Sequence, residues 1–423
     1  MRGKDCAAGR KTLRKPALIV AVVSLVLTSL FASSAWRTGR YRTLYRFTDG
    51  TDGAYSAGSL IFDANGNLYG TTAGGGAYSA GTVFKLMPQR DRLWKETVLH
   101  SFGGSGDGFY PGASLIFDSY GNLYGTTGRG GAYDKGTVFE LMPQLHGVWK
   151  LKLLHSFNGS DGWAPVCTLT MDSVGNLYGT TNEGGASSGG TVFEVKPNSD
   201  GSWTETVLHS FGGSQDGSYP FAGVVLDPDG NLYGTTSSGG PNSSGIAFEL
   251  MPQTDGTWKE NMIHAFANNG TDGYYPIGGL VFDAAGNLFG TTAGGGGGRV
   301  CGQFGCGLVF KLAPQRAGVW DESILHVFSG GDGSRPSAGL ILDSAGSLYS
   351  TTQNDGLYGY GTLFRLSPDR EGGWKAAVLH SFRDHPGALP VSGLVLDGQN
   401  RLYGTTQGDH QTTFGSVFVM HSH

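Results

Sequence analysis

Short apolar runs, separated by glycine-rich and polar turns, recur along the chain with a regular period. In the second copy these runs are 114–118 (SLIFD), 122–127 (NLYGTT), 136–141 (GTVFEL) and 148–157 (VWKLKLLHSF). Runs of this length bounded by turn residues are typical of β-strands. No long amphipathic helical pattern follows residue 35. The pattern therefore predicts four strands in each copy.

The most regular run gives the number of copies. It begins at Gly66, Gly121, Gly175 and Gly230 as GNLYGTT, at Gly286 as GNLFGTT, at Gly346 as GSLYSTT and at Asn400 as NRLYGTT. Successive copies begin 55, 54, 55, 56, 60 and 54 residues apart. Four strands per repeat is the content of one propeller blade. The sequence therefore predicts an all-β, seven-bladed β-propeller over residues 41–423, with a β-solenoid as the minor alternative.

The two ends of the repeated region predict how the ring closes. The region begins with a lone fourth strand at 43–47 (TLYRF) and ends with a third strand at 416–420 (SVFVM). The last blade thus lacks the strand that the N-terminal side supplies. Pairing the two would remove two exposed sheet edges, so we expect the N-terminal strand to close the propeller.

Three residue types recur once per repeat in positions that favour structural roles. An aspartate opens the turn after each first strand, where it can bond its own backbone; these are Asp63, Asp118, Asp172, Asp227, Asp283, Asp343 and Asp397. A tryptophan begins the fourth strand in six copies and is expected to cover the gap between blades; these are Trp94, Trp149, Trp203, Trp258, Trp320 and Trp374. The fourth strand also carries His100, His155, His209, His264, His326 and His380. Tyr45 stands in the equivalent place, so we expect hydrogen bonding and packing there rather than catalysis or metal binding.

The first 35 residues differ from the rest and predict export. Six basic residues precede an uncharged apolar stretch at 16–36, which is the pattern of a signal peptide or an N-terminal membrane anchor. We favour cleavage near Ala32–Ala35. The protein is then expected to be secreted, periplasmic or at the cell surface, with membrane contact only through this segment if it is retained.

Composition and charge exclude some classes of partner. Glycine accounts for 74 residues and charged residues for only 15%, as expected for short strands and tight turns. Beyond residue 35, 23 basic residues face 33 acidic ones. This acidic balance argues against nucleic-acid binding. We expect a monomer.

Cysteine usage agrees with an exported protein. Cys301 and Cys306 are separated by four residues in a glycine-rich insertion, RVCGQFGCG, which accounts for the one longer repeat. An oxidised pair is the expected state in that setting. Two thiols without a nearby histidine are too few for zinc, so no metal site is expected. Cys167 is expected to be a small buried residue.

Taken together, GNLYGTT, the following GG turn, GTVFKL and VLHSF resemble the bacterial GloVer, or Gloeo_Verruco, tandem repeats. The resemblance covers residues 41–423. It implies a secreted or surface protein with a variable means of anchoring, and it implies no particular activity.

One face of the predicted disc is the expected location of any ligand. The connection that follows each fourth strand has the pattern DGxYP and should emerge beside the glycine-rich loop between strands two and three. Aromatic rings beside carboxylates around a central pit would suit a glycan or a peptide. The candidate residues are Asp52, Tyr55, Asp107, Tyr110, Asp161, Trp163, Asp216, Tyr219, Asp272, Tyr275 and Arg335. The alternative is that each Asp-Gly pair shapes a turn and each tyrosine packs onto its neighbour.

No catalytic set emerges from the repeats. The chain contains no Ser-His-Asp signature, no GxxxxGK motif and no cofactor motif, so no catalytic residue and no cofactor are assigned. Acidic residues that break the repeat, such as Glu183, Asp355 and Asp409, occur in the loops between strands two and three. The sequence predicts an exported binding or scaffold module for an extracellular glycan or protein. A propeller-fold polysaccharide hydrolase or lyase is the alternative.

Overall fold

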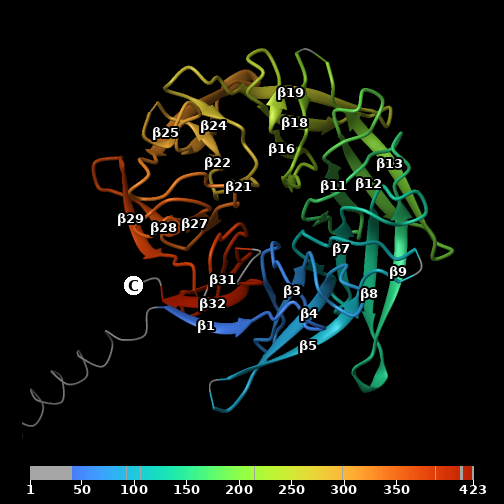
Figure 1. Ribbon diagram of the computed structural model, residues 1–423. Coiled ribbons are helices and arrows are strands. Elements are labelled where there is room, and N and C mark those ends of the chain that lie inside the picture. The colour runs from blue at the N-terminus through green and yellow to red at the C-terminus, as the bar shows by residue number, and fades with distance from the viewer. Residues whose placement is uncertain are drawn as a thin grey trace, which may run out of the picture.

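The computed structural model describes residues 41–421 except 92, 105, 214, 298, 386 and 410–412. The predicted export segment, 1–35, lies outside these residues. Within them, no helix is both long and apolar enough to cross a bilayer. Seven four-stranded antiparallel sheets form a ring, which confirms the predicted propeller (Figure 1).

Each sheet is one blade, and its strands follow one another outward from the axis. The first three blades are β2(Ile61–Phe62)–β3(Leu68–Thr72)–β4(Thr82–Pro88)–β5(Trp94–Ser101), β6(Ile116–Phe117)–β7(Leu123–Thr127)–β8(Thr137–Pro143)–β9(Trp149–Ser156) and β10(Thr170–Met171)–β11(Leu177–Thr181)–β12(Thr191–Pro197)–β13(Trp203–Ser210). The fourth, fifth and sixth are β15(Val225–Leu226)–β16(Leu232–Thr236)–β18(Ile246–Pro252)–β19(Trp258–Ala265), β21(Val281–Phe282)–β22(Leu288–Thr292)–β24(Leu308–Pro314)–β25(Trp320–Val327) and β26(Ile341–Leu342)–β27(Leu348–Thr352)–β28(Thr362–Pro368)–β29(Trp374–Ser381).

The seventh blade joins the two ends of the repeated region. It consists of β30(Val395–Leu396), β31(Arg401–Thr406), β32(Ser416–His421) and β1(Tyr41–Arg46). Tyr41 pairs with Met420 and Tyr45 with Val417, and Figure 1 shows β1 beside β32. The predicted closure by the N-terminal strand is confirmed.

The hydrophobic core lies between blades rather than at one centre. One cluster joins Tyr124 and Phe157 of the second blade to Leu177 and Phe193 of the third, and equivalent clusters follow around the ring. The glycine of each NLYGTT run makes room for an aromatic ring: a Cβ at Gly125 would lie 2.6 Å from Cζ of Phe139. The second and third strands are buried on both faces because the neighbouring blades cover them.

The tryptophans cover the gaps between blades, as predicted. Each one packs its ring on an aromatic side chain in the second strand of the preceding blade. The pairs are Trp94–Tyr403, Trp149–Tyr69, Trp203–Tyr124, Trp258–Tyr178, Trp320–Tyr233 and Trp374–Phe289.

The repeated aspartates after the first strands form turns, which confirms their predicted role. In the second blade, Asp118 Oδ1 accepts hydrogen bonds from the backbone N–H groups of Tyr120 and Asn122. Its Oδ2 accepts from the Asn122 amide and the Tyr124 hydroxyl. The same carboxylate therefore shapes the turn and positions the second strand.

Candidate functional site

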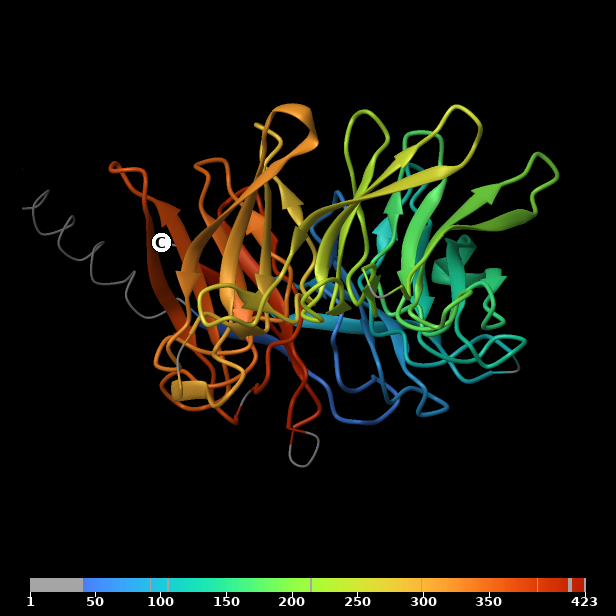
Figure 2. The ribbon, with the colours of Figure 1, turned by 90° about the horizontal axis from the view of Figure 1, so that it is seen from above.

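The connections that follow the fourth strands and the loops between the second and third strands form one side of the disc, which we call the loop face. Backbone pairs join the two loop families, for example Phe109 with Arg129, Trp163 with Glu183 and Ser334 with Asn354. Two short ribbons, β14(Gly217–Ser218)–β17(Ser238–Gly239) and β20(Gly273–Tyr274)–β23(Gly294–Gly295), make the same connection. Figure 2 shows these loops along one side of the ring and the hairpins along the other.

The predicted aspartates of the loop face bind groups of their own loops. Asp107 Oδ2 lies 3.0 Å from Nε2 of His100, and its Oδ1 accepts from the Gly103 backbone N–H. Asp161, Asp216 and Asp272 lie 3.0, 3.2 and 3.4 Å from His155, His209 and His264. Asp52 accepts from the Tyr45 hydroxyl at 3.0 Å instead. These four histidines, and Tyr45 where it replaces the histidine, therefore fix the loops that follow their strands.

The predicted tyrosines share a left-handed backbone conformation, which is unusual for residues other than glycine. Tyr55, Tyr110, Tyr219 and Tyr275 all have φ between 59° and 62°, and three of them precede a proline. Tyr110 N–H donates to Ala80 O and Tyr110 O accepts from Gly128 N–H, so the two bonds hold this left-handed conformation. Two of the rings remain exposed, at 51% for Tyr110 and 43% for Tyr219.

Trp163 occupies a different place from the tyrosines. Its backbone pairs with Glu183 just as that of Phe109 pairs with Arg129, whereas Ala164 has the positive φ of the tyrosine position. Nζ of Lys135 lies 3.7 Å from the centre of the Trp163 ring. Trp163 is therefore one residue out of register with the tyrosines that it was expected to match.

A channel along the ring axis has a volume of about 610 Å³ and is lined mostly by apolar and hydroxyl side chains, with Gln353 as the one amide among the described lining residues. Its lining includes Gly58, Ala113, Val166 and Ser392. Among the described residues, neither the predicted tyrosines nor a charged side chain belongs to this lining. Among the described residues, the axis therefore offers few charged or aromatic groups that could recognise a polar ligand.

A second cavity lies on the loop face between the fifth and sixth blades, where the insertion interrupts the repeat. Its volume is about 670 Å³. One wall is the insertion, with Cys301 and Phe304, and the opposite wall comes from the sixth blade, with Asn354 and Asp355. The structure brings two of the predicted residues, Tyr275 and Arg335, into this cavity.

The aromatic side of the cavity is built by stacked rings. Tyr274 and Phe304 are stacked, with ring centroids 5.9 Å apart and planes 16° apart, and Tyr275 lies beside Tyr274. Phe304 is 51% exposed. Such partly open, nearly parallel rings offer a flat apolar surface to a ligand.

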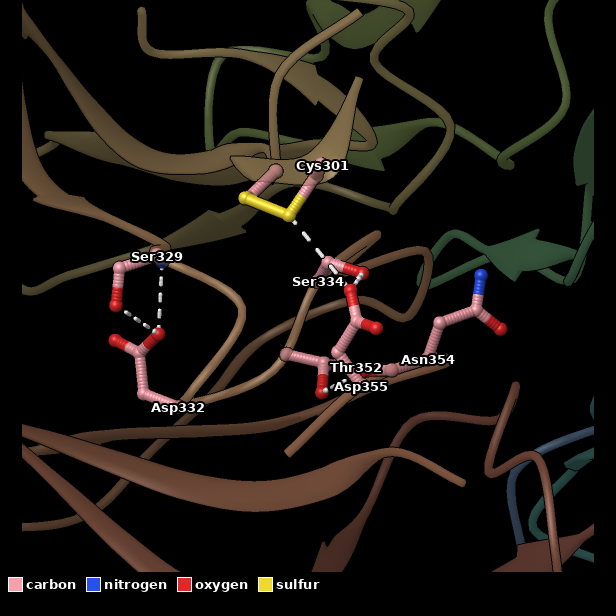
Figure 3. Close-up of a disulfide and its surroundings, with 8 residues drawn as sticks. Cys301, Ser329, Asp332, Ser334, Thr352, Asn354 and Asp355 are labelled. Atoms are coloured by element: carbon pink, nitrogen blue, oxygen red, sulfur yellow. Dashed lines mark hydrogen bonds between the residues drawn. A yellow bond between two sulfur atoms is a disulfide. The ribbon is translucent and has the colours of Figure 1, made fainter. Parts of the chain in front are cut away.

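The polar side is fixed by the disulfide region. Cys301 and Cys306 form a disulfide with their Cα atoms 5.1 Å apart. Asp355 Oδ2 lies 3.6 Å from Cys301 Sγ and accepts a hydrogen bond from the Ser334 hydroxyl (Figure 3). Asp355 is the only carboxylate among the described residues that line this cavity.

Sequence reasoning did not single out Tyr274, Phe304, Ser334 and Asn354 as parts of the site. The available signal was the insertion itself, because it places Phe304 in the one segment that breaks the repeat. A further set, Glu205, Glu260 and Glu322, was also missed. Each stands two residues after the tryptophan of its fourth strand and close to a His–Asp pair of the preceding blade.

Burial and nearby carboxylates raise the pKa of these glutamates, to about 8 for Glu205 and about 7 for Glu260 and Glu322. For His209, burial lowers the pKa, but the hydrogen bond and charge of Asp216, with the charge of Glu260, outweigh that effect and raise it. The balance is the same at His264, where Asp272 and Glu322 raise the pKa.

Comparisons with known proteins agree with the fold. No curated protein sequence matches the chain. Similar solved structures include an ancestral GH74 enzyme, at 12% identity and a TM-score of 0.58 over 88% of this chain and 48% of that one. This chain therefore spans about half the length of that enzyme, and at such identity the likeness is one of fold alone.

Two other solved structures are similar at lower TM-scores. An oxidoreductase (glucose dehydrogenase) from Thermus theromophilus is 14% identical, with a TM-score of 0.44 over 90% of this chain and 99% of that one. A luciferin-regenerating enzyme is 14% identical, with a TM-score of 0.43 over 88% and 92%. The family model of the Gloeobacter/Verrucomicrobia repeat matches residues 30–151, 97–301 and 299–423. The chain therefore belongs to the Gloeobacter/Verrucomicrobia repeat family.

Proposed function

We propose that the protein is an exported or cell-surface binding module that takes an extracellular glycan into the cavity between the fifth and sixth blades. The observation that carries the proposal is the asymmetry of this cavity. Seven repeats build similar loops, but the disulfide-bonded insertion adds an extra wall to one of them. A ligand that needs one defined site rather than seven equivalent ones would bind there.

The chemistry of the cavity suits a sugar. Its volume of about 670 Å³ falls within the usual range for small-ligand sites, roughly 300–1,000 Å³. Phe304 and Tyr274 can stack on the apolar face of a sugar ring, while Arg335, Asn354 and Asp355 can bond to its hydroxyl groups. Burial of a few hydroxyl groups against paired donors and acceptors would supply specificity.

Glycan hydrolysis is the second candidate, and the cavity favours it less. Glycosidases place two carboxyl groups on either side of the scissile bond, about 5–10 Å apart. Asp355 is alone among the described lining residues in carrying one, and the Ser334 hydroxyl already donates to it. Binding without cleavage is the function that this set of groups supports.

The test is a glycan-array screen of the full chain, followed by titration with the best binder. We expect Phe304→Ala and Arg335→Ala each to weaken binding about tenfold or more. The matched control is Tyr110→Ala, because Tyr110 has the same backbone position as Arg335 in another blade. An empty screen would overturn the glycan proposal. Equal losses in Tyr110→Ala and Arg335→Ala would overturn its placement in this cavity, and release of shortened products would favour the hydrolase.

A further inference from the structure

Three clusters of histidine, aspartate and glutamate lie at the boundaries between neighbouring blades. They are His155–Asp161–Glu205, His209–Asp216–Glu260 and His264–Asp272–Glu322. In each cluster, one ring nitrogen and two carboxylate oxygens all lie within 4.8 Å of one another. None of these groups belongs to the cavity proposed above for a glycan.

The propeller builds each cluster from two blades. In the first of them, β9 of the second blade supplies His155, the connection after β9 supplies Asp161, and β13 of the third blade supplies Glu205. The next two clusters use β13 with β19 and β19 with β25 in the same way. A ligand held by all three side chains would therefore tie adjacent blades together.

The distances match those around a small cation. His209 Nε2 lies 3.2 Å from an Asp216 oxygen and 3.9 Å from a Glu260 oxygen. His264 Nε2 lies 3.4 Å from Asp272 and 3.6 Å from Glu322. Ligand atoms about 2.1 Å from a tetrahedral zinc ion lie about 3.4 Å apart, so a modest adjustment of the side chains would suffice.

Each cluster has a buried carboxylate oxygen without a hydrogen-bond partner, and the third also has an unpaired imidazole nitrogen. Oε1 of Glu205, Glu260 and Glu322 is buried without a hydrogen-bond partner, and so is Nε2 of His264. Buried polar atoms are normally paired, because an unpaired one has lost its hydrogen bonds to water without replacing them. The side chains of His264 and Glu322 are only 20% and 17% exposed, which still leaves a path to solvent.

We propose that each of the three clusters binds one divalent transition-metal ion of the zinc type and that the bound ions link consecutive blades. An imidazole nitrogen with two carboxylates is a donor set that suits zinc, whereas calcium prefers six or more oxygen ligands. Three protein ligands leave a fourth position for water. Because each ion is held by residues of two blades, its binding energy adds to the stability of the folded ring.

The other boundaries provide controls within the same chain. At two of these boundaries another residue replaces the glutamate in the fourth strand, as the pairing registers show. It is Leu151 next to the His100–Asp107 pair and Ala376 next to the His326–Asp332 pair. At a further boundary, Glu96 is present and has an unpaired Oε1, but Tyr45 replaces the histidine. These boundaries lack one of the three ligands.

The experiment is isothermal titration of the chelator-treated full chain with Zn²⁺. We expect the triple variant Glu205→Leu, Glu260→Leu and Glu322→Leu to bind three fewer ions than the wild type, in line with the three clusters. Leucine is chosen because Leu151 occupies this position naturally. The control Glu96→Leu removes a similar buried glutamate and should leave the stoichiometry unchanged. If the triple variant does not fold, each single variant should bind one ion fewer.

Two results would overturn the proposal. One is a wild type that binds no more Zn²⁺ than the triple variant, which would mean that the buried glutamates hold protons instead. The other is an equal loss in Glu96→Leu, which would show that no histidine is needed. As an independent readout, Co²⁺ bound to the wild type should give visible absorption bands of a four-coordinate site, and His209→Gln should reduce their intensity by about one third.

Discussion

Tyr41 lies flat against the imidazole of His380, with ring centroids 4.0 Å apart and planes 2° apart. Tyr41 belongs to the strand that closes the ring, and His380 belongs to the sixth blade. His380 thus contacts an aromatic ring at the boundary where Pro386 replaces the loop aspartate in the sequence. Burial lowers the pKa of His380 to about 4, and the charge of Arg383 contributes in the same direction.

We expect this histidine to make stability depend on pH. The unfolded chain protonates His380 near pH 6.5, whereas the folded chain does so only near pH 4. As the pH falls through that interval, the unfolded state binds the proton first and the free energy of unfolding decreases, by about 2 kcal/mol after allowance for partial exposure. Urea unfolding at several pH values should show this loss in the wild type and a smaller one in His380→Phe. His385→Gln, at an exposed histidine, is the control, and an unchanged slope in His380→Phe would contradict the assignment.

Tyr45 tests whether the His–Asp pairs and the Tyr–Asp pair are equivalent. Its hydroxyl donates to Asp52 at 3.0 Å, in the place where other blades use histidine. Tyr45→Phe should lower the free energy of unfolding by about 1–2 kcal/mol, because the charged carboxylate of Asp52 loses the hydrogen bond that the Tyr45 hydroxyl donates to it. Tyr45→His should retain most of the stability. Chemical denaturation measures both, and a histidine variant as unstable as the phenylalanine variant would argue against equivalence.

Asp118 tests the repeated turn. Its carboxylate accepts hydrogen bonds from two backbone N–H groups, the Asn122 amide and the Tyr124 hydroxyl. Asp118→Ala should lower the free energy of unfolding by about 2–4 kcal/mol, because several hydrogen-bond donors lose their acceptor at once. The exposed Asp321 in β25 offers a control whose replacement by alanine should change little. Equal effects of the two changes on the unfolding midpoint would contradict the turn assignment.

The disulfide tests the wall of the proposed glycan cavity. Cys301 lines the cavity and lies beside Asp355, so opening the bond should loosen the insertion that carries Phe304. We expect Cys301→Ser with Cys306→Ser to weaken glycan binding several-fold, because the insertion must be ordered again on binding. The same change should have a smaller effect on the unfolding of the blades, which lie outside this short loop. Undiminished affinity of the double variant would show that the wall is not needed.

The sequence predicted the blades well because each rule behind them acts seven times. The repeat length and the four strands per copy can be read from any one of the seven copies. The strands at the two ends of the repeated region then predict the pairing of Tyr41 with Met420. The aspartate turns and the tryptophan contacts were predictable for the same reason. Chance variation in one copy cannot hide such a pattern.

The candidate sites depend on contacts between repeats, and that is where prediction failed or stopped. Nothing in one copy indicates that Glu205 lies near Asp161 of the preceding blade, because the contact depends on how neighbouring fourth strands align. The proximity of Phe304 to Tyr274 likewise depends on the path of an insertion without a repeat to guide it. Trp163 does not match the tyrosines because the third copy carries its aromatic residue at the position of Phe109 and has Ala164 at the tyrosine position, a local substitution that the repeat pattern does not foretell.

The pairing of β1 with β32 also determines the order of assembly. Because Tyr41 pairs with Met420, the seventh blade cannot form until the whole repeated region between them has been synthesised. Contacts between residues so distant in sequence slow folding, and until β32 is in place the edges of β1 and β31 lack partners and are open to pairing with other chains. A chain truncated before β32 should therefore tend to self-associate.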